Sequence, residues 1–292
     1  MDRKKRIKKR IFLIIISILL IYITASLIWS NNILTYSSYN IESSKIKNNI
    51  RFVMVSDSEG KVFGENNSRL IEKVKGADPE FVVILGDMVN RNNGDYQSAV
   101  NLCKNLAKSY PVFYAIGNHE NTVYNNNTNY TNEFVSAIKN TGTKILVNEL
   151  VNYKTKGGDV LAIAGLKQFP FFEYDAPDYN NEENHLFQQF LAQEDDSHLS
   201  VLLCHCPETY IWGLENYNID LMLCGHTHGG VVRLPFAGGL YAPEQGWFPQ
   251  YDKGYYTNGN ASMLITSGLS VSSVFPRFNN PPDVAIVNLT AK

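Results

Sequence analysis

Cys224-Gly225-His226-Thr227-His228-Gly229-Gly230 is the stretch that predicts most about this chain, because it closes a short apolar run with two histidines between glycines. Residues at positions i and i+2 of an extended backbone point to the same side. We therefore expect His226 and His228 to face one cavity, with Thr227 turned away. The glycines remove side chains where the backbone must turn sharply close to a bound group.

Other polar groups also follow apolar runs. Short apolar runs bounded by polar residues predict buried strands, and the runs are Phe52–Val55, Phe81–Leu85, Val112–Ile116, Val201–Cys204 and Leu221–Cys224. Polar residues at the carboxyl ends of such strands face a common crevice in open α/β sheets. The groups at or just after these ends are Asp57, Asp87, Asn118, His205, His226 and His228. Imidazoles with carboxylates are typical ligands of Zn, Fe or Mn, and there are enough of them for two ions.

With these motifs in one chain, the sequence resembles the calcineurin-like metallophosphoesterases, and in particular their membrane-anchored bacterial branch. The resemblance rests on Gly225–Gly230 followed by Arg233-Leu234-Pro235-Phe236, and on the tail Phe275–Asn279 with Pro281-Pro282. It covers most of the chain after Ile50. It implies an α/β fold, the calcineurin-like four-layer sandwich of two packed mixed β-sheets flanked by helices.

The resemblance also implies two metal sites and a reaction. The first site would hold Asp57, Asp87 and His228, and the second would hold Asp87, Asn118, His205 and His226. His119 is not a ligand in that pattern, but acts beside the phosphate as a general acid or charge stabiliser. The implied reaction is hydrolysis of a phosphoester or diphosphate, in which a metal-bound water attacks phosphorus in line.

The first motif departs from the family pattern, because Asp57-Ser58-Glu59 has Glu59 where the family usually has a histidine ligand. A carboxylate is harder than imidazole, so ligation by Glu59 favours Mn among the expected cofactors, two divalent ions of Mn, Fe or Zn. Alternatively, Glu59 points outward and the first site is weak. The chain would then be a catalytically weakened, membrane-tethered binding protein on the same fold. Metal-dependent cleavage of a different ester or of an amide is a third hypothesis.

Several nearby side chains receive secondary roles. Glu120 either orients His119 through a hydrogen bond or is solvated. The four cysteines are expected to be buried free thiols rather than disulfides. His185 and His198 are expected to be surface or packing residues.

The N-terminus predicts a membrane anchor. Residues 1–10 are strongly basic, and Ile11–Ser30 contains no charged residue, which matches the roughly 20 apolar residues that span a bilayer. A cleavable signal peptide is the competing interpretation, although its apolar region is shorter. The positive-inside rule keeps residues 1–10 in the cytoplasm and places the domain outside the cell membrane as a single-pass protein.

The charge pattern narrows the range of partners. The formal net charge is −2, and the chain beyond residues 1–10 is more acidic than this value suggests. Nucleic-acid binding requires a basic face, so we expect no nucleic-acid partner. The expected partners are the membrane and a phosphorylated small-molecule or lipid-linked substrate, and the oligomeric state stays open.

The remaining elements are predicted from periodicity and turn residues. Residues 31–49 predict a polar tether with a short ordered part near Ile33–Tyr39, and the metallophosphoesterase domain is expected over residues 50–292. The expected helices are Ser68–Lys75, Tyr96–Ser109, Asn132–Lys139 and Glu183–Leu191, and further strands are expected at Ile145–Val147, Leu150–Tyr153 and Val160–Ala164. The aromatic stretches Phe169–Tyr179 and Gly246–Tyr256 are expected to form either binding walls or a hydrophobic cover.

Overall fold

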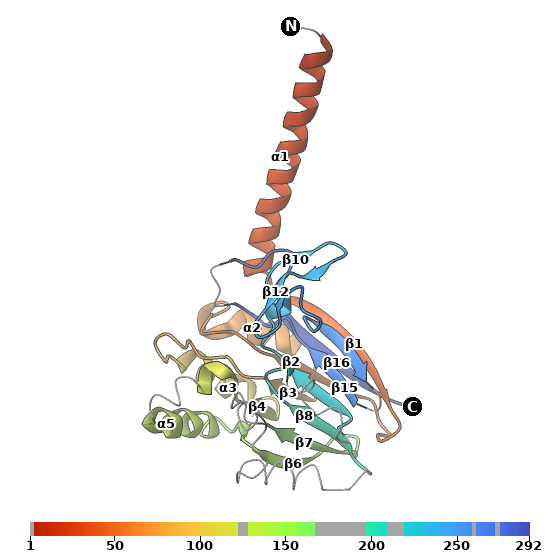
Figure 1. The fold of residues 1–292 in the computed structure, drawn as a ribbon. Coiled ribbons are helices and arrows are strands. Elements are labelled where there is room, and N and C mark those ends of the chain that lie inside the picture. Colours follow the sequence, from red (N-terminus) through yellow and green to blue (C-terminus); the bar gives the residue numbers. More distant parts are fainter. Residues whose placement is uncertain (1–2, 122–127, 167–196, 209–218, 259–260, 272–274) are drawn as a thin grey trace, which may run out of the picture.

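Two mixed six-stranded sheets form the centre of the fold in the computed structural model, which describes residues 3–121, 128–166, 197–208, 219–258, 261–271 and 275–292. The first sheet contains, in spatial order, β1 (Thr35–Ser43), β16 (Asp283–Ala291), β2 (Ile50–Val55), β3 (Phe81–Ile84), β4 (Val112–Ala115) and β5 (Lys144–Leu146). The second contains β14 (Gly254–Asn258), β15 (Ala261–Ile265), β9 (Leu221–Cys224), β8 (Leu199–Leu203), β7 (Val160–Gly165) and β6 (Glu149–Lys154). The long helix α1 (Arg3–Asn32) projects from one end of this sandwich (Figure 1).

Each sheet has a parallel centre. Strands β2, β3, β4 and β5 are parallel to one another, as are β7, β8, β9 and β15. Antiparallel partners are added toward the edges, where β16 pairs with β2, β14 with β15, and β6 with β7. Within each parallel set the carboxyl ends lie on the same side, which is the arrangement that the apolar runs predicted. All eight predicted strands are present, with ends that differ by one or two residues.

Alternation along the central strands fills two cores. In β2, Phe52 and Met54 face the second sheet, while Val53 and Val55 face the helices, as a period of two requires. Phe81 lies in the core between the sheets, where its ring stacks on Phe52 at 4.7 Å and meets Phe113 edge-on at 5.7 Å. Aromatic pairs of this kind add to the stabilisation from burial.

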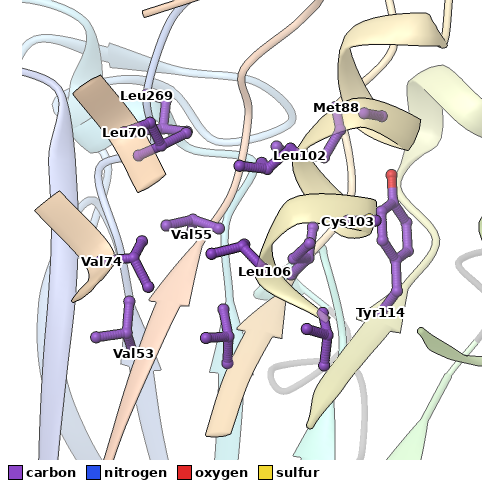
Figure 2. Packing of buried hydrophobic residues seen from close by; sticks show 14 of the residues in the cluster. Val53, Val55, Leu70, Val74, Met88, Leu102, Cys103, Leu106, Tyr114 and Leu269 are labelled. Carbon is purple, nitrogen blue, oxygen red and sulfur yellow. The ribbon is translucent and has the colours of Figure 1, made fainter. Parts of the chain in front are cut away.

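Helices α2 (Ser68–Gly76), α3 (Gln97–Leu106) and α5 (Thr128–Lys139) cover the outer face of the first sheet. Figure 2 shows Leu70 and Val74 of α2 over the face of β2, with Leu102 and Leu106 of α3 beside them. This spacing of three to four residues gives each helix a single apolar stripe. The predicted helices at Ser68–Lys75 and Tyr96–Ser109 are confirmed with small shifts.

The domain begins earlier than the sequence predicted. Strand β1 pairs in parallel with β16 over its whole length, from Thr35 opposite Asp283 to Ser43 opposite Ala291. The expected polar tether is therefore wrong for Thr35–Ser43, although the short ordered part that was expected near Ile33–Tyr39 overlaps this strand. The side chains of β1 give no apolar pattern from which the strand could be predicted, because Ile41 is the one buried residue among the nine. This edge strand is held mainly by backbone hydrogen bonds.

Other elements differ in detail from the predictions. Helix α5 begins at Thr128 rather than Asn132, and strands β14, β15 and β16 were not predicted. In the aromatic stretch Gly246–Tyr256, Tyr251 and Tyr256 pack on the outer face of the second sheet, as a hydrophobic cover would. The predicted helix Glu183–Leu191, the stretch Phe169–Tyr179 and His185 lie outside the described residues. His198 is half-buried at the start of β8. All four cysteines, each within the described part, are buried free thiols as predicted.

Packing between the sheets generates a stability prediction. Phe81→Ala should lower the free energy of unfolding by about 3–5 kcal/mol. The substitution removes a fully buried ring and leaves a cavity between the sheets that the second sheet cannot move to fill. Glu72→Ala, an exposed change on α2, should alter it by less than about 0.5 kcal/mol. Urea unfolding followed by circular dichroism measures both variants. Equal effects would show that the intersheet core is not the main source of stability.

Candidate active site

Polar side chains from both sheets converge where the parallel strands end. Asp57 follows β2, Asp87 follows β3, and Asn118 and His119 follow β4. From the second sheet, His205 follows β8, and His226 and His228 follow β9. All of these except the half-buried Asn118 are buried. The structure thus brings the predicted site residues together from strands that are far apart in the sequence.

Backbone geometry marks the same residues. A positive φ is uncommon outside glycine, yet five of the predicted metal ligands adopt it: Asp57 (56°), Glu59 (51°), Asp87 (51°), His226 (69°) and His228 (51°). Such conformations carry a cost in free energy, cluster at functional sites and persist where the surroundings impose them. The cluster therefore supports a functional centre independently of the residue types.

The His-x-His segment reaches the site in a different way from the one predicted. The backbone is not extended there, because Thr227 has helical angles and the short 3-10 helix η3 (His228–Gly230) begins at once. Thr227 does turn away as expected, and its hydroxyl donates to the carbonyl oxygen of Asp252 at 2.5 Å. The prediction that Thr227 turns away is confirmed, but its reason, an extended backbone from His226 to His228, is wrong.

Two motif glycines are required by close approach. A Cβ atom on Gly117 would lie 2.2 Å from Oδ1 of Asp87, and one on Gly225 would lie 2.1 Å from Oγ of Ser56. Neither glycine has a positive φ, so space rather than backbone freedom explains them. The absence of a side chain at Gly117 lets the ends of β3 and β4 approach within the first sheet, and its absence at Gly225 lets the end of β9 approach the end of β2 in the other sheet.

Asp87, His205 and His226 form one group that could hold a metal ion. One ligand atom from each lies within 4.8 Å of the others, and Nε2 of His205 is 3.2 Å from Oδ2 of Asp87. Nδ1 of His205 donates to the carbonyl oxygen of Leu85 at 2.5 Å, which directs Nε2 into the site. Nε2 of His205 and Nδ1 of His226 are buried without a hydrogen-bond partner among the described residues. Buried nitrogen atoms of this kind, next to a carboxylate, fit a divalent cation.

Glu59 lies in the part of the site that contains His228 and His119. Its side chain is 4% exposed, and Oε1 is 3.6 Å from Nε2 of His228 and 3.8 Å from Nε2 of His119. Nδ1 of His228 is 3.1 Å from the carbonyl oxygen of Ser270 and 3.9 Å from Oδ1 of Asp57. The alternative prediction, in which Glu59 points outward, is therefore wrong. A further group of Glu59, Asp87 and His119 could also hold an ion, so Asp87 belongs to both halves of the site.

The charges of the site are set by burial and by crowding of carboxylates. Burial lowers the pKa of His228 to about 4, which keeps this imidazole neutral and able to bind a cation. Burial also lowers the pKa of His205, but the charges of Asp87 and Asp57 outweigh it and raise that pKa to about 10. Reciprocally, His205 keeps the pKa of Asp87 low despite its burial. A proton on His205 therefore occupies the place that a cation can take, so metal binding should release it.

Glu120 has a role that the sequence did not predict. It is buried, and Oε2 accepts hydrogen bonds from the backbone N–H groups of Asp87 (2.8 Å) and Gly117 (3.0 Å). Oε1 accepts from the N–H of Met88 at 2.9 Å and from the hydroxyl of Tyr114 at 2.6 Å. Both predicted roles, orienting His119 and contact with solvent, are therefore wrong. Glu120 instead ties the loop after β3 to the loop after β4.

Glu244 and Arg277 are further site residues that sequence reasoning missed. Glu244, between β12 (Tyr241–Ala242) and β13 (Gly246–Trp247), lies 2.6 Å from Nε2 of His226 through Oε2. No sequence signal near Glu244 predicts this contact.

Arg277 is almost fully buried and donates to five carbonyl oxygens, those of Ser267, Gly268, Ser270, Asn280 and Pro281. Burial lowers its pKa to about 10, so it stays cationic at neutral pH. Arg277 thereby holds the loop whose Ser270 carbonyl lies against His228. The sequence offered this arginine only as part of a resemblance.

A thiol ligand is disfavoured by the electrostatics of the site. Cys206, Glu208 and His226 are close enough to hold an ion. Burial raises the pKa of Cys206 well above its usual value, however, and Glu208 and Cys204 raise it further. Since the thiolate is the form that binds metals, the carboxylate and imidazole groups are the better ligands.

The fold and the site define a metal-dependent phosphoester hydrolase, and the comparisons with known proteins agree. The family model described as calcineurin-like phosphoesterase matches residues 50–230. The chain is 32% identical to an uncharacterized metallophosphoesterase of Campylobacter jejuni over 96% of this chain and 69% of that protein. It is 26% identical to the protein YpbG of Bacillus subtilis over 88% of both chains, and 25% identical to the phosphodiesterase YaeI of Escherichia coli over 72% of this chain and 70% of that one. The chain therefore belongs to the calcineurin-like phosphoesterase family.

The hydrogen bonds of Glu120 predict that it positions the loops after β3 and β4 and does not act on the substrate itself. Glu120→Gln places an amide donor against N–H donors, so it should cost about 1–3 kcal/mol of stability and weaken metal binding through the loop of Asp87. Tyr114→Phe removes one of the four donors and should cost about 1 kcal/mol with little loss of metal. Thermal unfolding and metal titration measure both. If Glu120→Gln kept stability and metal affinity and lost turnover alone, the residue would act on His119 instead.

Proposed function

We propose that this metal-dependent phosphoesterase is a membrane-anchored, dinuclear phosphohydrolase in which Asp87 would belong to the ligand sets of both cations. One observation carries this assignment: Asp87 is near His205 and His226 on one side, and near Glu59 and His119 on the other. Oδ2 of Asp87 faces both sides, because it lies 3.2 Å from Nε2 of His205 and 3.5 Å from Nε2 of His119. Oδ1 of Asp87 accepts the backbone N–H of His119 at 2.8 Å, which holds Oδ2 toward His205.

The proposed ligand sets follow from the two halves of the site. The first ion would be held by Asp57, Glu59, Asp87 and His228, and the second by Asp87, Asn118, His205 and His226. When bound, two such ions bind the phosphoryl oxygens and make a water nucleophilic at neutral pH. The protein contributes a buried arrangement of ligands that is already in place before the substrate binds, which favours charge stabilisation in the transition state.

His119 is proposed as the general acid or charge stabiliser. Its Nε2 lies 3.5 Å from Oδ2 of Asp87 and 3.8 Å from Oε1 of Glu59. A general acid of this kind donates a proton to the leaving oxygen, and a charge stabiliser hydrogen-bonds to the phosphoryl oxygens. The loop after β4 fixes His119, because its backbone N–H is bonded to Asp87.

Helix α1 supports the proposed anchor. This single helix is long enough and apolar enough to span a membrane. Its C-terminal end is in contact with the domain, where Ser26 and Ser30 are buried. A cleavable leader needs no such contact. We therefore propose a single-pass protein with the N-terminus in the cytoplasm and the domain outside. A lipid-linked phosphate is the proposed substrate class, and the name of the E. coli relative supports a diester.

The dinuclear assignment predicts different defects for two neighbouring residues. The full chain in detergent should contain close to two ions, hydrolyse bis-p-nitrophenyl phosphate and lose this activity in EDTA. Asp87→Asn should remove metal and activity together, because it weakens both sites. His119→Ala should keep the metal and reduce turnover by about 10²–10⁴-fold.

Metal analysis and steady-state kinetics on the same preparations measure these outcomes. An active preparation with one ion or none would overturn the dinuclear mechanism. Loss of metal in His119→Ala would show that His119 is a ligand rather than an acid. Full activity of Asp87→Asn would remove this centre from the reaction.

Glu59 predicts the metal preference. With three carboxylates and one imidazole in the first set, Mn²⁺ should activate better than Zn²⁺ at matched free concentration, because the ligands are hard. Glu59→His should shift the preference toward Zn²⁺ and retain activity, whereas Glu59→Ala should lower the occupancy of one site. Activation curves and metal titration by calorimetry give both quantities. An unchanged Glu59→Ala variant would exclude this residue from the ligands.

A further inference from the structure

Helix α1 contacts the domain well before the helix ends. Tyr22, Ser26 and Ser30 are spaced by four residues and thus share one face. Ser26 and Ser30 are buried, whereas most of the apolar side chains of α1 are exposed. The contact therefore runs along about two turns of the apolar helix, rather than being confined to its last residue.

Hydrogen bonds to a single segment of the domain make this contact specific. Oγ of Ser26 donates to Oδ1 of Asn279 at 2.7 Å, and the backbone N–H of Asn279 donates to Ser26 at 3.0 Å. The side-chain amide of Asn279 donates to the hydroxyl of Tyr22 at 2.7 Å, and the ring of Tyr22 meets Phe278 edge-on at 5.8 Å. The backbone N–H of Asn280 donates to Ser30 at 3.1 Å.

The length of the helix gives this contact a consequence. The hydrocarbon core of a bilayer is about 30 Å thick, which needs about 20 residues of α-helix. If the core begins at Ile11, directly after the basic residues, it ends near Ser30. Tyr22 is only about 17 Å along the helix from Ile11. The parts of the domain that touch Tyr22 therefore lie at a depth inside the bilayer, before the point at which the helix leaves the apolar core.

Changes in tilt or register do not remove this overlap. A tilted helix needs more residues to cross the same thickness, which moves the exit point further beyond Tyr22. Moving the core toward the N-terminus would bury the charges of Lys8, Lys9 and Arg10, at a high cost in free energy. Lys61 and Arg69 bind the backbone carbonyls of Asn31 and Asn32, so positive charge gathers at the level expected for lipid headgroups.

Exposed aromatic side chains lie in the part of the domain that is attached to this contact. The backbone N–H of Arg233 donates to the carbonyl of Phe278 at 2.9 Å, and Asn279 donates to the carbonyl of Arg233 at 3.3 Å. Strand β10 (Arg233–Leu234) is thereby fixed beside α1, and β10 and β12 lie at the end of the domain from which α1 projects (Figure 1). Between β10 and β11 (Gly238–Gly239), Phe236 is fully exposed, and Trp247 and Phe248 at the end of the next hairpin are 66% and 61% exposed.

We propose that Leu234, Phe236, Trp247 and Phe248 form a membrane-contact surface that inserts into the lipid interface beside α1. Tryptophan is enriched at this interface because its ring is amphipathic, and Phe and Leu are common on the apolar face of segments that lie in the interface. Exposed apolar groups of this kind next to an apolar helix are typical of interfacial attachment. The inference rests on the proposed membrane anchor.

The surface is close in the sequence to a residue that contacts the active site. Glu244, in the turn between β12 and β13, contacts Nε2 of His226, and Trp247 follows three residues later. Insertion of Trp247 and Phe248 therefore places the side of the site formed by His226 next to the bilayer. A phosphate on a lipid headgroup can then reach the site without leaving the membrane.

Tryptophan fluorescence in vesicles tests this surface on the full chain. Trp29→Phe, Trp212→Phe and Trp247→Phe together give a tryptophan-free protein, into which one reporter at a time is placed. The reporters are native Trp247, Phe236→Trp, Ile18→Trp in the middle of α1, and Asn152→Trp on the exposed side of β6. Each protein is reconstituted in phosphatidylcholine vesicles with bromine atoms at shallow or deep positions of the acyl chains. Circular dichroism and metal content confirm that each variant is folded.

The four reporters separate the inference from the anchor proposal. We expect Ile18→Trp to be quenched by deep bromines, Trp247 and Phe236→Trp to be quenched by shallow bromines, and Asn152→Trp to be unaffected. If Ile18→Trp is quenched and both surface reporters behave like Asn152→Trp, the membrane-contact surface is wrong and the anchor stands. If Ile18→Trp is not quenched, the anchor proposal fails, and this inference fails with it. Blue-shifted but unquenched surface reporters would show that protein covers the surface, and would also overturn the inference.

Discussion

The buried carboxylate of Asp87 is the point on which the two halves of the molecule depend. It follows a strand of the first sheet, yet Oδ2 lies 3.2 Å from Nε2 of His205, which follows a strand of the second sheet. Charges interact strongly where water is excluded, so the pair holds only if both sets of strand ends keep this separation. The core between the sheets sets that separation, which connects the packing of Phe81, remote from the chemistry, to the geometry of the site.

Two other buried charges hold the loops that carry the ligands. Glu120 accepts the backbone N–H groups of the loops after β3 and β4, while Arg277 donates to the carbonyls of the loop near His228. A buried charge is tolerable when its hydrogen bonds are satisfied, and here backbone groups satisfy both. Arg277 also opposes the negative charge of Asp57 and Glu59. The positive φ angles of the ligands thus have a physical support in buried charged side chains rather than in glycine.

The segment that Arg277 organises also receives the N-terminal helix. The side chain of Asn280 donates to the backbone carbonyl of His228 at 2.6 Å, while its backbone N–H donates to Ser30 of α1. Helix and site therefore share one short stretch of backbone. On this geometry, the position of the site relative to the helix depends on hydrogen bonds and not on the length of a flexible linker.

The sequence by itself determined the class of fold, most of the central strands and the residues that meet at their ends, because apolar runs followed by Asp, Asn and His are local patterns. It also identified Glu59 as a departure, although not its orientation. Tertiary structure alone decided the rest. Strand β1 is held by backbone pairing with β16, and Glu120, Glu244 and Arg277 act on residues brought near by folding. Contacts between distant segments leave no periodic trace in the sequence, since neither partner constrains the residues around it.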